Sequence, residues 1–222
     1  MLVQDIMQAS VVTTTVEAPL ADAYRTMIDQ SVRHLPVMDD GALVGVVTDR
    51  DLRHATSDLH SSPVQAHAPV QTAMSADPIV AGPLDPVEDI ARILRSRRIG
   101  CMPVLDGDTL VGIVTVTDLL DAVTRLTGLR KPSGRLAVSL PDEPGQLARL
   151  TSRVAAEGID IRSVLSYYED EIDEGPESEP SAEVPPSRLR IILRLDTINV
   201  RPIAATLRDE DFDVVWPVDT PT

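Results

Sequence analysis

The chain has 222 residues, of which 43% are hydrophobic and only 2% aromatic, so it can build one to three small domains with aliphatic cores. Its formal net charge of −15 argues against binding to a nucleic-acid backbone, and no apolar run approaches the ~20 residues that a transmembrane helix needs. A single cysteine excludes an intrachain disulfide, and the first residues lack a signal-peptide pattern, so we expect a cytoplasmic protein without a membrane partner.

The first half of the chain contains an internal repeat. Residues 5–55 align without a gap on residues 72–122, at an offset of 67 and with sixteen of 51 positions identical. A fixed offset over that length indicates two copies of one structural unit. We place the first copy at residues 1–60 and the second at residues 68–127.

Each copy predicts the order strand, helix, strand, strand, helix. The first helix follows Pro19 or Pro86, where apolar residues recur at the i, i+3, i+4, i+7 spacing. The second helix is expected to begin at Asp51 or Asp118. One such unit is too small to bury its own sheet, so we expect the copies to pack together. The strands are expected at residues 11–16, 35–38 and 43–47 in the first copy and at 78–80, 102–105 and 110–114 in the second.

Two motifs recur in register. They are LPVMD (35–39) with MPVLD (102–106), and GVVTDRDL (45–52) with GIVTVTDL (112–119). Together they resemble a pair of CBS domains, the tandem regulatory unit also called a Bateman module, over about residues 1–125. The resemblance implies an α+β fold of two β-α-β-β-α repeats packed as a pair. It also implies a cleft that binds AMP, ADP, ATP or S-adenosylmethionine as a regulatory ligand.

A threonine and an aspartate recur three residues apart, as Thr48 with Asp51 and as Thr115 with Asp118. In one interpretation each pair is a capping box, which satisfies backbone N–H groups at the start of a helix. In the other, the carboxylate at the helix N-terminus accepts hydrogen bonds from the hydroxyls of a ribose. The resemblance favours the ligand role, because this position commonly contacts the ribose in CBS domains.

The resemblance implies further lining residues, which we group by repeat. The apolar members would pack against the base, and the polar members would hold ribose and phosphate. His34 and Arg50 equip the first site for phosphate better than Cys101 and Thr117 equip the second, because they can donate charge-assisted hydrogen bonds. Arg97 and Arg98 could reach the central cleft, but we expect them on a solvated helix face. The first site comprises Val12, Val32, His34, Thr48, Arg50 and Asp51, and the second comprises Ile79, Ile99, Cys101, Thr115, Thr117 and Asp118.

Residues 134–218 predict a third unit with the order β-α-β-β-α-β, which fits a ferredoxin-like fold. The helices are marked by the apolar stripes Leu147, Leu150, Val154 and Val200, Ile203, Ala204, Leu207, and the strands are expected at 135–140, 158–168, 189–195 and 211–217. The acidic segment at residues 169–187 carries eight acidic residues and no basic one, so we expect it to be disordered.

The motif DEPGQL (142–147) and this element order resemble the ACT domain. The resemblance implies a possible amino-acid site at Asp142, Gly145, Gln146 and Leu147. Alternatively Pro144 and Gly145 only form the turn, Asp142 caps the helix, and the unit serves dimerisation. Asp160, where the family often has asparagine, counts against the amino-acid site.

The sequence predicts a protein without catalytic activity. No common metal spacing, P-loop or nucleophile motif is present, and Cys101 is expected to be a small buried hydrophobe. We expect a ligand-sensing regulator that forms a homodimer and acts on a partner enzyme. The alternative is a structural subunit with vestigial sites that docks on such an enzyme. A CBS pair followed by an ACT domain resembles the acetoin-utilisation accessory proteins of bacteria.

Overall fold

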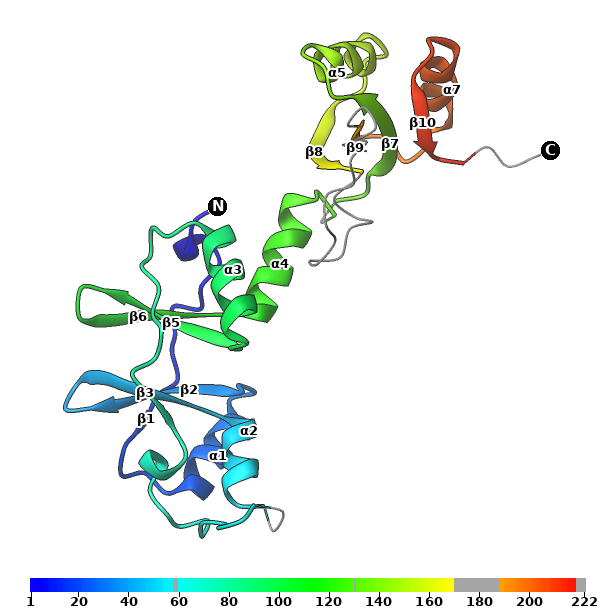
Figure 1. Cartoon of the computed structure of the whole chain (residues 1–222). Coiled ribbons are helices and arrows are strands. Elements are labelled where there is room, and N and C mark those ends of the chain that lie inside the picture. Colours follow the sequence, from blue (N-terminus) through cyan, green and yellow to red (C-terminus); the bar gives the residue numbers. More distant parts are fainter. Residues whose placement is uncertain (58–59, 130, 170–187, 219–222) are drawn as a thin grey trace, which may run out of the picture. The chain divides into compact units, whose positions relative to one another are not determined.

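The computed structural model describes residues 1–57, 60–129, 131–169 and 188–218 (Figure 1). Contacts divide the chain into two compact units, Met1–Ala122 and Val123–Thr222. Apart from Glu169, the acidic segment that we expect to be disordered lies outside the described residues. No helix in the described ranges has both the length and the apolarity that a membrane crossing requires.

The first unit contains the two repeats, and apart from the short strand before each first helix their elements follow each other at the predicted offset. The first repeat holds η1 (Val3–Asp5), β1 (Thr14–Thr15), α1 (Leu20–Asp29), β2 (His34–Asp39), β3 (Ala42–Thr48) and α2 (Asp49–Ala55). The second holds η2 (Val70–Thr72), β4 (Ser75–Ala76), α3 (Val87–Arg97), β5 (Cys101–Asp106), β6 (Thr109–Thr115) and α4 (Val116–Leu126). The predicted first helices are confirmed, and Pro19 and Pro86 are their N-cap residues.

Two predictions about the element bounds were wrong. The second helix of each repeat begins two residues earlier than expected, at Asp49 and Val116, because Thr48 is the N-cap residue of α2 and Asp51 its third residue. The leading extended pieces are also shorter than expected. Only Thr14–Thr15 pairs as a strand in the first. In the second, residues 78–80 form no strand, and the equivalent pairing is a single parallel bridge from Ala81 to Val104.

Each repeat completes the hydrophobic core of the other. Val3 and Ile6, from the start of the first repeat, are buried in the cluster that contains Met102 of the second. Val70, from the start of the second repeat, is buried with Leu35 of the first. The leading segments are therefore exchanged, and the two repeats form one unit because neither core is complete without the other.

The backbone pairing follows the same exchange. Ser75 in β4 pairs antiparallel with Val46 in β3. At the equivalent positions of the other repeat, Gln8 pairs antiparallel with Ile113. Each central strand thus has a neighbour from the other repeat, and this neighbour brings side chains of both repeats to the same place.

The glycine of each recurring GVVT or GIVT motif is required because a segment of the other repeat passes close to its Cα atom. A Cβ on Gly45 would lie 2.7 Å from Met74 Sδ and 3.0 Å from the backbone oxygen of Ser75. A Cβ on Gly112 would lie 2.5 Å from Met7 Sδ, with only side-chain atoms nearby. Both methionines belong to the exchanged segments, so these glycines make room for the exchange.

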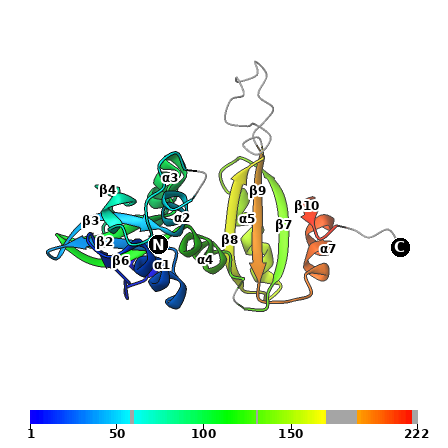
Figure 2. The same cartoon turned by 90° about the horizontal axis from the view of Figure 1, so that it is seen from below.

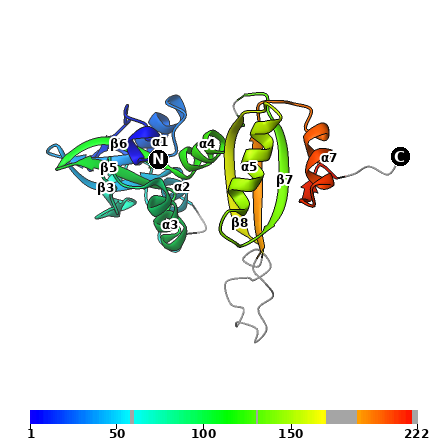
Figure 3. The ribbon, with the colours of Figure 1, turned by 90° about the horizontal axis from the view of Figure 1, so that it is seen from above.

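The second unit has the predicted order β-α-β-β-α-β. Its elements are β7 (Gly134–Pro141), α5 (Gln146–Ala156), β8 (Ile161–Tyr168), β9 (Arg188–Leu195), α7 (Arg201–Asp209) and β10 (Asp213–Trp216). The strands form an antiparallel sheet in the order β10-β7-β9-β8. Viewed from below and from above, α5 lies across one face of this sheet (Figures 2 and 3). Leu136 and Val138 of β7 and Ile191 and Leu193 of β9 share one buried cluster with residues of both helices, so these side chains form the core face of the sheet.

The start of α5 differs from the prediction. Gly145, with φ of 93°, is the N-cap residue and makes no side-chain cap, so the interpretation of Asp142 as the cap was wrong. Leu150 and Val154 are buried as expected, whereas Leu147 is 40% exposed and does not extend their stripe into the core. Strand β8 begins at Ile161, three residues later than expected.

Candidate functional site

A cavity of about 620 Å³ opens between the two repeats of the first unit. This volume is within the usual range for small-molecule sites. Residues of four segments line the cavity, namely Arg33, His34, Val46, Thr48, Asp49, Arg50, Asp51, Ser75, Ala76, Asp77, Pro78, Ile79, Arg98, Ile99, Gly100 and Cys101. The exchanged strand β4 explains this mixture, because its pairing with β3 carries residues 75–79 to the first repeat.

The cavity does not follow the grouping by repeat that we expected. It brings together His34, Thr48, Arg50 and Asp51 from the first group with Ile79, Ile99 and Cys101 from the second. Val12 and Val32 do not line it and pack instead against the core of the first repeat. Thr115, Thr117 and Asp118 do not line it either. Sequence alone could not give this grouping, because the exchange of the leading segments is a property of the tertiary fold.

Thr48 and Asp51 form the predicted capping box. The Thr48 backbone N–H and hydroxyl donate to Asp51 Oδ2 at 2.9 and 2.7 Å, and the Asp51 N–H donates to Thr48 Oγ1 at 3.1 Å. The other carboxylate oxygen, Asp51 Oδ1, accepts no hydrogen bond from any described residue. The two interpretations are therefore compatible, because the cap uses one oxygen and leaves the second available at the cavity.

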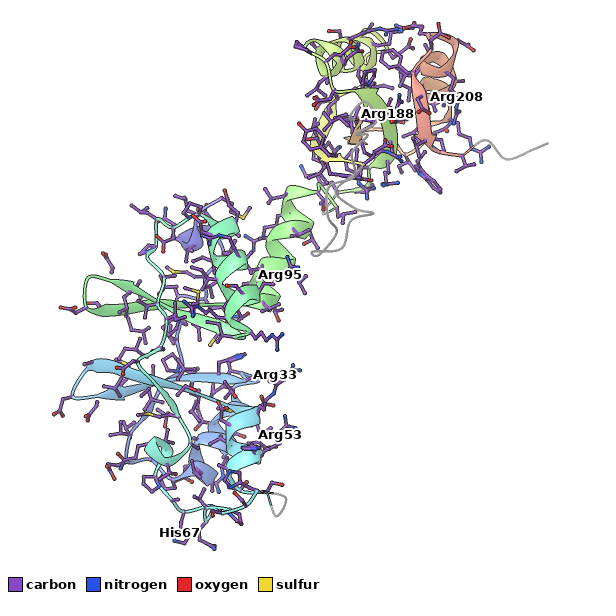
Figure 4. All side chains as sticks on the ribbon, viewed as in Figure 1. Arg33, Arg53, His67, Arg95, Arg188 and Arg208 are labelled. Atoms are coloured by element: carbon purple, nitrogen blue, oxygen red, sulfur yellow. The ribbon has the colours of Figure 1, made fainter. Side chains whose placement is uncertain are left out.

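Three arginines line the cavity, and sequence reasoning named only Arg50 as a site residue. Arg33 directly precedes β2, and Arg98 directly follows α3 in the left-handed conformation, with φ of 54°. Arg98 is exposed, as expected, but it follows α3 as a left-handed cap residue and also lines the cavity. Figure 4 shows Arg33 beside the boundary between the sheets of the two repeats.

None of these three guanidinium groups forms an ion pair with a carboxylate of the residues that the structure describes. The contrast is Arg53, whose guanidinium lies 2.8 Å from Asp49. Cations that line a cavity without a carboxylate partner can donate charge-assisted hydrogen bonds to an anion. Their signal in the sequence was weak, because single arginines before a strand or after a helix are common on protein surfaces.

His34 and Cys101 occupy equivalent positions in the two repeats, and both line the cavity. A Cβ on Gly100 would lie 2.7 Å from His34 Nε2, so the absence of a side chain at Gly100 makes room for the imidazole. Burial lowers the pKa of His34 below its usual value, against the opposing effect of Asp49 and Asp51. Burial, with a smaller contribution from Asp51, raises the pKa of the Cys101 thiol to about 12, so the thiol is not a nucleophile at neutral pH.

Asp118 has the same capping box but a different surrounding. The Thr115 backbone N–H and hydroxyl donate to Asp118 Oδ2 at 2.8 and 2.7 Å, and the Asp118 N–H donates to Thr115 Oγ1 at 3.3 Å. Asp118 Oδ1 accepts a hydrogen bond from Gln8 Nε2 at 3.3 Å. Only 8% of Asp118 is exposed, so this residue is buried, whereas Asp51 is partly exposed and lines the cavity.

The candidate residues of the second unit are grouped at the start of α5. Asp142, Gly145 and Leu147 are exposed, and the amide of Gln146 donates to Glu143 Oε2 at 3.3 Å. These contacts neither form nor exclude an amino-acid site. Within the described ranges, no group of three or more histidine, cysteine, aspartate or glutamate side chains could hold a metal ion.

Comparison with known proteins identifies the first unit. Residues 3–58 and 70–125, together 112 of the 222 residues, match the CBS domain family. A CBS domain-containing protein of Dictyostelium discoideum is 33% identical over 135 residues, which cover 56% of this chain and 92% of that protein.

Solved structures match a similar share of the chain. A protein described as an acetoin utilization protein (AcuB) of Vibrio cholerae is 30% identical with a TM-score of 0.52, covering 59% of this chain and 95% of that one. CBSX2 in complex with AMP is 27% identical with a TM-score of 0.51, covering 56% and 97%. The CBS domain pair of MJ0100, in complex with 5-methylthioadenosine and S-adenosyl-L-methionine, is 29% identical with a TM-score of 0.50, covering 59% and 98%.

Proposed function

The chain belongs to the CBS domain family, and from this premise we propose that it is a non-catalytic sensor that binds an adenine nucleotide in the cavity beside Asp51. One observation carries the proposal. A carboxylate with a free oxygen and three arginines without described carboxylate partners line one cavity of about 620 Å³. A nucleotide presents hydroxyls and phosphate, which these two kinds of group bind.

Each part of the nucleotide has residues that suit it. The ribose hydroxyls donate to Asp51 Oδ1, which the capping box leaves free. The apolar side chains of Ile79 and Ile99 pack against the base. Arg33, Arg50 and Arg98 bind the phosphate. His34, held largely neutral by burial, can donate one hydrogen bond to it.

AMP is the ligand that we favour. The complexes of CBSX2 with AMP and of MJ0100 with 5-methylthioadenosine and S-adenosyl-L-methionine support an adenosine moiety. The three arginines then favour a phosphate over the sulfonium of S-adenosylmethionine, because like charges repel. ADP and ATP stay candidates, since the same arginines suit their longer phosphate chains.

For the second unit we propose an ACT domain at residues 134–218, acting in dimerisation or as a second ligand-binding unit. The order β10-β7-β9-β8 of its antiparallel sheet supports the proposal. Apolar residues of α4 support a homodimer, because Leu120, Val123 and Leu126 are each more than half exposed along one helix. We also propose that the chain regulates a partner enzyme in acetoin utilisation; the similarity to the Vibrio cholerae protein supports the link to acetoin utilisation.

Calorimetric titration separates the sensor from a structural subunit with vestigial sites. The wild-type chain is titrated with AMP, ADP, ATP and S-adenosylmethionine. We expect AMP to bind, Asp51→Ala to abolish binding and the matched variant Asp118→Ala to retain it. If none of the four ligands binds, the structural subunit becomes the better account. Equal binding by wild type and Asp51→Ala would refute the site.

A further inference from the structure

Gln8 and Ser75 occupy equivalent positions in the two repeats, 67 residues apart, but only Gln8 is hydrogen-bonded to the aspartate of the nearby capping box. Each follows a methionine that packs on the glycine of a central strand, and each pairs antiparallel with that strand. The Gln8 side chain reaches Asp118 and donates to its Oδ1. The shorter Ser75 side chain donates no hydrogen bond to Asp51 within the described part of the chain.

We propose that Gln8 closes the second site of the pair by taking the position on Asp118 Oδ1 that a ligand hydroxyl takes on Asp51 Oδ1. The chain then binds one nucleotide, in the cavity beside Asp51. This inference rests on the proposed function, because it assumes that a ribose hydroxyl donates to Asp51 Oδ1 and that Gln8 makes the equivalent hydrogen bond to Asp118 Oδ1.

The geometry fixes Gln8 in this role. Its backbone N–H donates to the Ile113 carbonyl at 2.9 Å, and its carbonyl accepts from the Ile113 N–H at 3.1 Å. These two bonds anchor the residue to β6, the strand that leads to Asp118. A carboxamide N–H is a donor, as a ribose hydroxyl is, so it satisfies the same carboxylate lone pair. The covered Asp118 is consistent with this, since only 8% of it is exposed.

The charges around Asp118 indicate what an opened second site would take. The offset places Thr117 where the first site has Arg50, and Ser31 where it has Arg98. Ser31 and Arg98 have the same left-handed φ of 54°, so the offset holds in the backbone at this point. Neutral side chains at both positions favour an uncharged nucleoside over a nucleotide. Adenosine is therefore the probe for this site.

The test exchanges the two equivalent residues. Equilibrium dialysis measures the number of adenosine and AMP molecules bound per chain by wild type, Gln8→Ser and Ser75→Gln. We expect wild type to bind one AMP and Gln8→Ser to bind one adenosine more than wild type does. Ser75→Gln should bind AMP about tenfold more weakly, because the ligand then loses one hydrogen bond to a charged group. Thermal unfolding of each variant verifies that the first unit is folded.

The outcomes separate this inference from the proposed function. If wild type binds one AMP and Gln8→Ser gains no adenosine, the closure is refuted and the sensor stands. If wild type binds nothing and Gln8→Ser binds one adenosine, the closure stands and the site at Asp51 is refuted. Two ligands bound to wild type, or no ligand bound to either wild type or Gln8→Ser, would refute the closure of the second site by Gln8. If Gln8→Ser does not fold, unchanged AMP affinity of Ser75→Gln refutes the inference.

Discussion

The two repeats of the first unit share one frame and differ where a ligand would touch them. In both, a proline is the N-cap residue of the first helix, a methionine side chain packs on a strand glycine, and a capping box holds the aspartate. They differ at the second carboxylate oxygen, which in Asp51 has no hydrogen-bond donor among the described residues and in Asp118 accepts from Gln8. They also differ in charge, with Arg50 in one repeat and Thr117 in the other.

This difference shows that an aspartate can form the capping box without being available to a ligand. The cap accounts for Thr48 and Asp51 in full as structural residues, and Thr115 with Asp118 has the same geometry. The binding role depends instead on what surrounds the free oxygen. The predictions below therefore change one repeat at a time, with its equivalent in the other as control.

The largest expected effect is on AMP affinity when the free carboxylate is made neutral. Asp51→Asn should weaken AMP binding about 100-fold, because hydrogen bonds to a charged group contribute about 1.5–3 kcal/mol. Asparagine can still accept the capping hydrogen bonds, so the helix should stay intact. Calorimetry compares this variant with Asp118→Asn, for which we expect less than about a threefold change. Similar losses in the two variants would mean that both carboxylates bind AMP or that the effect is structural.

The next effect concerns stability and the exchanged segments. Gly45→Ala should destabilise the first unit by about 2 kcal/mol, because the new Cβ meets a backbone carbonyl that cannot rotate away. Gly112→Ala should cost less, about 1 kcal/mol, because only the flexible side chain of Met7 has to move. Thermal unfolding of the two variants measures this difference. The reverse order would show that the methionine contact, and not the carbonyl, limits the space.

Exchanging charges should change ligand preference rather than remove binding. The double variant Arg50→Thr with Arg98→Ser gives the first site the neutral residues found at the equivalent positions of the second repeat. We expect AMP affinity to fall about tenfold, because charge-assisted hydrogen bonds to the phosphate are lost. Adenosine affinity should stay within about a factor of two. A parallel loss for adenosine would indicate that the arginines support the fold of the cavity instead.

The smallest effect is a pH dependence that distinguishes His34 from Cys101. Burial lowers the pKa of His34 in the folded state below its ordinary value of 6.5. Between the two pKa values the unfolded chain binds more protons, so His34 contributes stability above about pH 6.5 that is lost as the pH falls. His34→Cys should reduce this loss, measured as the melting temperature of wild type and variant between pH 8 and pH 5. An equal loss in both proteins would assign the pH dependence to other groups.

Much of the fold could be predicted because local signals decide it. Pro19 and Pro86 begin helices since proline has no N–H to lose there, and the alternation in β9 defines its buried face. The helix start at Asp49 was missed although Thr48 had been recognised as a cap, because the first residue of α2 has no signal of its own. Leu147 was misplaced since Gly145 turns the chain just before α5.

The site could be predicted only in part, because its walls come from two repeats. Thr48, Asp51 and His34 were named from the sequence, whereas Asp77 reaches the cavity through the exchanged segment, and Arg33 and Arg98 reach it from single positions before β2 and after α3. The difference between Gln8 and Ser75 is visible in the aligned repeats. Its meaning needs the hydrogen bond to Asp118, which no sequence pattern gives.

Native mass spectrometry of the wild-type chain with AMP tests the difference between the two repeats most directly, because it counts ligands on each chain. The proposed function and the closure by Gln8 together predict one AMP per chain, lost in Asp51→Asn and retained in Asp118→Asn. Two AMP molecules per chain, or a single one that is lost in Asp118→Asn and retained in Asp51→Asn, would contradict the account.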